Sequence, residues 1–66
     1  MTWKQLHPGD RLLTNYGVET FIGFHLDGTL QIEPDNPKVL LKPLGEVKLL
    51  KVVRFGQIIY IRKKDV

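Results

Sequence analysis

Residues 18–33 read VETFIGFHLDGTLQIE and have the pattern of a β-hairpin. In residues 18–26, apolar or β-branched side chains occupy every second position, the period of a half-buried strand. These positions are Val18, Thr20, Ile22, Phe24 and Leu26. We expect these five side chains to face the core. Gly23 stands on the other face and predicts a bend or bulge, where a strand turns the corner of a curved sheet.

The Asp27-Gly28 pair predicts the turn of this hairpin, because Asp-Gly favours a two-residue type I′ loop. Residues 29–33 then form the returning strand, with Leu30 and Ile32 facing inward. A two-residue loop would set apolar residues of the first strand against polar residues of the second. Either the loop is therefore longer, or a bulge shifts the register.

Outward from this hairpin, turn signals follow at short intervals. Upstream, Pro-Gly at 8–9 precedes a strand over residues 10–14, and a second turn follows at 15–17. Downstream, the two prolines of residues 34–37 end the sheet ladder, because proline has no N–H to donate. Residues 38–42, apolar between two lysines and followed by proline, predict a protected edge strand.

The last third of the chain predicts a second hairpin. Residues 46–54 and 57–62 flank a turn at Phe55-Gly56, and both strands carry apolar side chains on both faces. Val47 and Leu50 also fit a helical spacing, so a helix is the alternative for the first segment. The paired valines and the glycine turn favour a strand.

The pattern therefore predicts one all-β domain over residues 1–66. We expect five to six short antiparallel strands in a small barrel or a strongly bent sheet. The chain has no cysteine, so its compactness depends on apolar packing, alone or with self-association. We see neither a secretory signal nor an apolar run of membrane-spanning length, and we expect a cytoplasmic protein without a membrane partner.

Two segments resemble the opening of SH3-like barrels, including the KOW and Tudor groups. They are LHPGDRL at residues 6–12 and GVETFIG at residues 17–23. The resemblance covers about residues 6–33 and implies a small barrel. The clustered aromatics of a Tudor cage are not evident, and the second half of the chain matches no particular member. A fold of this kind does not fix a function.

The residue inventory argues against an enzyme. The chain contains neither serine nor cysteine, which excludes serine and thiol nucleophiles. His7 and His25 have no set of partners with the spacing of a metal or catalytic site. No glycine-rich phosphate loop is present. We expect no catalytic residues, no metal and no cofactor.

Charge is divided unevenly along the chain. Residues 1–37 carry two basic and five acidic side chains, and residues 38–66 carry eight basic and two acidic ones, which gives −3 and +6. A basic half of this kind predicts phosphate neutralisation and binding of RNA or single-stranded DNA. The candidate binding residues are Lys38, Lys42, Lys48, Lys51, Arg54, Arg62, Lys63 and Lys64. Candidates for base stacking or partner contact are Trp3, Tyr16, Phe55 and Tyr60. Trp3 has a second possible role, covering an open end of the barrel.

The alternative is a protein-interaction or assembly module without a nucleic-acid role. A strand that is apolar on both faces needs cover on both faces, and a chain of 66 residues is too short to supply it everywhere. The second hairpin could then pair its edge with a partner protein or with a second copy in a homo-oligomer.

Overall fold

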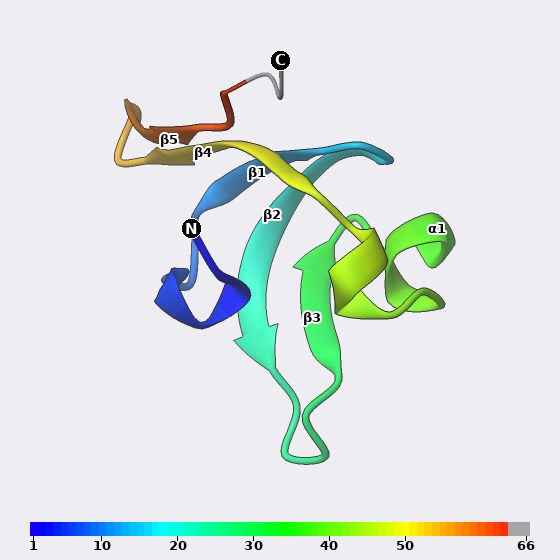
Figure 1. The fold of residues 1–66 in the computed structure, drawn as a ribbon. Helices are drawn as coiled ribbons and strands as arrows, with labels where there is room; N and C mark the ends of the chain where they lie inside the picture. Colours follow the sequence, from blue (N-terminus) through cyan, green and yellow to red (C-terminus); the bar gives the residue numbers. More distant parts are fainter. Residues whose placement is uncertain (64–66) are drawn as a thin grey trace.

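The computed structural model describes residues 1–63 and is built mainly from strands (Figure 1). Its elements, in chain order, are the 3₁₀ turn η1 (Trp3–Gln5), β1 (Arg11–Thr14), β2 (Gly17–Phe24), β3 (Leu30–Glu33), the short helix α1 (Pro37–Leu40), the 3₁₀ turn η2 (Leu44–Glu46), β4 (Leu49–Arg54) and β5 (Gln57–Ile61). Within residues 1–63, no helix has the length and apolar character needed to cross a membrane.

The strands form one antiparallel sheet in the order β3-β2-β1-β4-β5. Of the five to six antiparallel strands predicted, five form and lie in one sheet. In residues 1–63 the sheet is curved, with β3 and β5 as its two edges, so of the two predicted forms the structure has the bent sheet and is not closed into a barrel. The segment between β3 and β4 forms α1 and η2 instead of a sixth strand, and no strand within the described part of the chain joins the two edges.

The β2–β3 hairpin has a three-residue loop and a bulge, so the predicted two-residue loop is wrong. The His25 N–H donates to the Thr29 carbonyl at 2.8 Å, and the Gly28 N–H donates to the His25 carbonyl at 2.9 Å. Gly28 adopts a φ of +86°, as the last residue of such loops requires. The predicted bulge is confirmed, because the β2–β3 register shifts between Phe21 and Gly23.

The alternation predicted for β2 is present, but the inner and outer faces are reversed in the part of the strand before the bulge. Beyond the bulge, Phe24 pairs with the buried Leu30 and lies on the inner face as expected. Glu19 and Phe21 are buried, whereas Val18 is 62% exposed. Leu26 lies beyond the strand in the exposed loop. The sequence pattern favoured the wrong face because it placed the carboxylate outside. In the structure, that carboxylate is buried and accepts hydrogen bonds from Thr14 Oγ1 and Asn36 Nδ2, at 3.2 and 2.7 Å.

The edge strand predicted over residues 38–42 does not form. Asn36 Oδ1 accepts from the Lys38 N–H at 3.0 Å and caps α1, which begins at Pro37. Asparagine at the cap and proline in the first turn together favour a helix start. Val39 from this helix is 1% exposed and belongs to the core.

The second predicted hairpin is confirmed as a strand pair, although its first strand begins later than expected. Residues 44–46 form η2, and β4 starts at Leu49. The turn places Phe55 at a φ of +52° and Gly56 at +75°. Two positive φ values are the requirement of a type I′ loop. The tight primed turn therefore occurs in this hairpin.

The core lies on the inner side of the curved sheet, where η1, α1 and η2 also contribute. Its buried apolar members are Leu6, Leu12, Phe21, Leu30, Ile32, Val39, Val47, Leu49 and Val52. Leu30 and Ile32 face inward as expected. Trp3, Tyr16, Leu44 and Tyr60 pack against this cluster and remain partly accessible.

Candidate interaction surface

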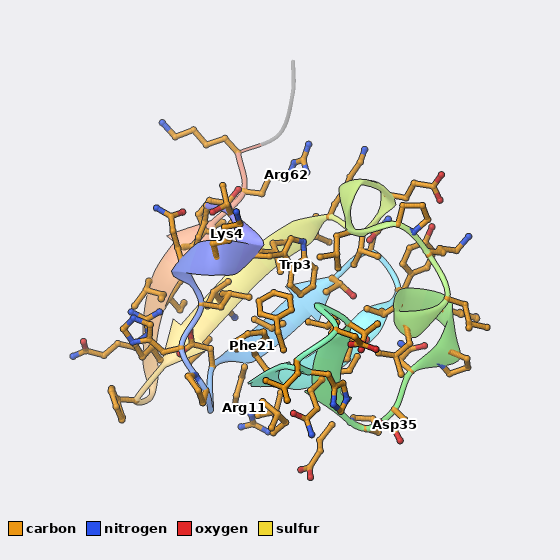
Figure 2. All side chains as sticks on the ribbon, turned by 90° about the horizontal axis from the view of Figure 1, so that it is seen from below. Trp3, Lys4, Arg11, Phe21, Asp35 and Arg62 are labelled. Carbon is orange, nitrogen blue, oxygen red and sulfur yellow. The ribbon has the colours of Figure 1, made fainter. Side chains whose placement is uncertain are left out.

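The side of the sheet away from the core carries two rows of side chains, which we call the outer face. Directly paired residues of neighbouring antiparallel strands place their side chains on one face, about 5 Å apart. The first row runs from β5 to β3 as Ile58, Val53, Arg11, Thr20 and Glu33, with the exposed Glu33 carboxylate at its end. The second row runs from β5 to β2 as Ile61, Lys51, Leu13 and Val18. In Figure 2, Arg11 extends away from the side on which Trp3 and Phe21 lie.

The outer face is aliphatic where a solvated sheet face would be polar. The exposed fractions are 39% for Leu13, 62% for Val18, 53% for Ile58 and 61% for Ile61. Open antiparallel sheets commonly alternate apolar side chains inward with polar side chains outward. Contiguous exposed apolar patches on small domains mark binding surfaces. The arrangement therefore suits contact with another apolar surface.

Two cations interrupt the aliphatic rows. Arg11 and Lys51 stand in different rows and line a shallow groove of about 240 Å³ together with Leu13, Val18 and Val53. Among residues 1–63, neither cation has a carboxylate within ion-pair distance. The groove is thus an apolar depression bordered by unneutralised positive charge.

Strand β5 adds an open edge to this surface. It pairs with β4 on one side and is the last strand of the sheet. Of its side chains, Tyr60 packs toward the core, while Ile58, Ile59 and Ile61 are exposed. An edge strand without a charged side chain, a proline or a cover is open to pairing with another strand. The apolar character predicted for both faces of this strand is therefore present and uncovered.

Arg54, one of the predicted phosphate ligands, has a structural role. Its Nε and Nη2 donate to the two carboxylate oxygens of Asp10 at 2.9 and 2.8 Å, and Nη2 also donates to the Gln5 carbonyl at 3.2 Å. Asp10 is 1% exposed and also accepts from the His7 N–H at 2.8 Å. The hydrogen bonds from Arg54 lower the pKa of Asp10 below its ordinary value of 3.8, and the same contact raises the pKa of Arg54. This pair ties η1, β1 and β4 together.

The other basic candidates are spread over both edges of the sheet. Lys38 and Lys42 belong to the α1 region beside β3, and Lys42 Nζ lies 5.3 Å from the centre of the Tyr16 ring. Lys48 precedes β4 and is exposed. At the opposite edge, Arg62 and Lys63 follow β5, and the Arg62 N–H donates to the Leu50 carbonyl at 2.8 Å. Lys64 lies outside the described residues.

The aromatic candidates divide into three packed rings and one exposed ring. Trp3, Tyr16 and Tyr60 pack against the core. Phe55 is 98% exposed at the β4–β5 turn. The six aromatic side chains therefore place no ring in either row of the outer face. A series of stacking platforms, as single-strand binders use, is not part of this surface.

Sequence reasoning missed the outer face because its members come from five strands. Leu13 and Val18 flank the turn at residues 15–17, and their pairing depends on the register of β1 and β2. The sequence did offer one signal. In several strands the alternate positions that do not belong to the core are also aliphatic. No group of three histidine, cysteine, aspartate or glutamate side chains in residues 1–63 is arranged to bind a metal ion.

Comparison with known proteins gives no further assignment. No protein-family model, no curated protein and no solved structure matches this chain.

Proposed function

We propose that this chain is a protein-interaction module that docks through its outer face onto another protein. The observation that carries the proposal is the pair of aliphatic rows across β5, β4, β1 and β2, which lie on the solvent side of an open sheet. A standard interface covers about 800 Å² of each partner, roughly a sixth of the 4964 Å² surface of this chain. The outer face and the β5 edge together suit a contact of that size.

The cations of the outer face indicate the chemistry of the partner. Two copies packed face to face would bring four cations, Arg11 and Lys51 from each, into one interface, against the two Glu33 carboxylates at its β3 edge. The like charges would oppose each other, and the net charge of +3 on each copy adds to this repulsion. A different protein with aliphatic side chains flanked by carboxylates removes the repulsion and neutralises both cations. We therefore propose an acidic and apolar partner surface.

Two substitutions on the outer face test this proposal. Leu13→Gln and Val18→Thr remove apolar area from partly exposed positions, so the fold is expected to persist with a small loss of stability. Leu41→Gln is the matched control, because Leu41 is 84% exposed but follows α1, outside the outer face. We expect the partner captured from the native host to bind the wild-type chain and the control, and to lose at least tenfold in affinity for the double variant.

Hydrogen exchange of the reconstituted complex locates the contact independently. Protection of amides in β1, β4 and β5 is expected when the purified partner is added. Equal binding by the double variant and the wild type would overturn the proposal. So would a dimer in sedimentation that dissociates on Val18→Thr substitution, because the outer face would then bind a second copy.

A nucleic-acid role is the second candidate, supported by the +6 charge of residues 38–66 and by the exposed Lys38, Lys42, Lys48 and Lys63. Its test is the binding of labelled single-stranded RNA and DNA, whose affinity should fall steeply with salt. Absence of binding at low salt would reject it. For the fold, the β1–β2–β3 succession and the bulge before Gly23 support a proposed distant relation to SH3-like barrels.

A further inference from the structure

A cleft on the other side of the molecule carries an inference separate from the outer face. Its walls are Trp3 from η1, Phe24 from the end of β2 and Leu44 from η2, and Thr2, Lys4 and Gly28 complete it. Its volume is about 620 Å³, which lies within the range of about 300–1,000 Å³ for small-molecule sites. We call it the Trp3 cleft.

The walls of the Trp3 cleft are held in place by the core beneath them. Trp3 and Leu44 pack against the buried apolar cluster. The Phe24 ring meets the buried Phe21 ring edge to face, with 5.6 Å between the ring centres. Figure 2 shows Trp3 and Phe21 close together on the inner side of the sheet, with Lys4 on the same 3₁₀ turn as Trp3. A site with walls fixed by packing loses little freedom when it binds a ligand.

The charge at the Trp3 cleft selects the class of ligand. Lys4 is the one ionisable side chain among the lining residues, and it is exposed at the rim. Aromatic rings alone could hold a cation, since their faces are electron-rich. The adjacent ammonium group repels a cation and attracts an anion. We propose that the Trp3 cleft binds a small organic carboxylate, with its apolar body between Trp3, Phe24 and Leu44 and its carboxylate beside Lys4.

Three ten-carbon probes of different head-group charge test this proposal. Decanoate, 1-decanol and decyltrimethylammonium share one apolar tail. The two ionic probes are titrated into the whole chain below their micelle-forming concentrations, and decanol below its solubility limit. Trp3 is the single tryptophan of the chain, so its fluorescence reports on the cleft directly. We expect decanoate to bind most tightly and decyltrimethylammonium most weakly.

Substitutions then assign the contributions of charge and of the apolar wall. Lys4→Gln should weaken decanoate binding about two- to five-fold, the effect of one exposed charge pair, and leave decanol binding unchanged. Lys63→Gln is the matched control, because Lys63 is exposed and does not line the cleft. Phe24→Ala should weaken both decanoate and decanol.

Two results would overturn the proposal. One is absence of any fluorescence change with decanoate. The other is an affinity order in which decyltrimethylammonium equals or exceeds decanoate. Equal effects of Lys4→Gln and Lys63→Gln would reject the assigned role of Lys4. Since Lys4→Gln alters an exposed side chain, its result does not depend on whether the Phe24 variant folds.

Discussion

Replacing Asp10 by asparagine removes the charge from the pair that joins the N-terminal segment to β4. Asp10 accepts two hydrogen bonds from the Arg54 guanidinium and one from the His7 N–H, and it is 1% exposed. Asparagine has nearly the same shape but one acceptor oxygen. At least one donor of Arg54 then loses its partner, and the positive charge stays beside a neutral amide.

The expected loss of stability follows from the burial of the two partners. Removing one member of a fully buried ion pair costs about 3–5 kcal/mol, and one hydrogen bond to a charged group is worth about 1.5–3 kcal/mol. The Arg54 side chain keeps 22% exposure, so water can partly solvate it in the variant. We therefore expect Asp10→Asn to reduce the free energy of unfolding by about 2–3 kcal/mol. For a chain of this size, with a total stability of roughly 3–5 kcal/mol, that is a large fraction of the whole, from about 40% upward.

Urea unfolding at pH 7, followed by Trp3 fluorescence, measures this loss. Asp27→Asn is the matched control. Asp27 also accepts hydrogen bonds that lower its pKa, from the Thr29 hydroxyl and N–H, but it is exposed in the β2–β3 loop. We expect a much smaller change from this control. If the loss comes from the unpaired guanidinium, Asp10→Asn combined with Arg54→Met should be more stable than Asp10→Asn alone.

The pH dependence supplies a second readout of the same pair. Folding lowers the pKa of Asp10 below 3.8, so the unfolded chain binds this proton more readily than the folded chain. The contribution of the pair is complete above about pH 5 and disappears as the pH falls through the folded-state pKa. The difference between wild type and Asp10→Asn should therefore be constant from neutral pH down to about pH 5 and shrink at lower pH. A loss at pH 7 below about 0.5 kcal/mol, the scale of ordinary surface substitutions, would refute the reasoning.

Three further substitutions test local features of the fold by the same urea assay. Phe55→Asn should raise the free energy of unfolding by about 0.5–1 kcal/mol, because asparagine tolerates the positive φ of this exposed turn position better than phenylalanine; a lower urea midpoint would contradict this. Glu19→Leu should cost about 1–3 kcal/mol, because one N–H of the Asn36 amide loses its acceptor while the Thr14 hydroxyl keeps the Gly17 carbonyl at 3.0 Å. Glu19→Gln should cost under about 1 kcal/mol. Equal losses would show that the charge matters more than the hydrogen bonds. Asn36→Ala should cost about 2–4 kcal/mol, because it removes both the α1 cap and the hydrogen bond to the buried Glu19 carboxylate, and an unchanged midpoint would exclude both roles.

Strand positions were predictable from the sequence because alternation and turn residues are local signals. The hairpin over residues 18–33 and the turn at Phe55-Gly56 both occur where the pattern placed them. The face of β2 that meets the core was not predictable in the same way. Which alternate side chains of β2 are buried depends on Asn36. This residue lies 17 residues from Glu19 in sequence, and its side-chain amide donates the hydrogen bond that lets the Glu19 carboxylate be buried.

The short helix α1 had a local signal that competed with another. Asn36 followed by Pro37 is a helix-start pattern, since asparagine caps the first N–H groups and proline fits the first turn. The apolar run after Lys38 instead suggested a strand. The capping geometry prevailed, because Val39 reaches the core from the helix.

The candidate interaction surface depends on pairings that no single segment contains. A charge count treats Arg54 like any other cation, yet Asp10, 44 residues away, neutralises it. The apolar character of the second hairpin correctly indicated that β5 needs cover, but the surface that needs covering also includes Leu13 and Val18 from the first half of the chain. A partner that covers it must contact strands from both halves. An isolated peptide of β4 and β5 would therefore present Ile58 and Ile61 without the β1 and β2 side chains and should not reproduce the binding of the whole chain.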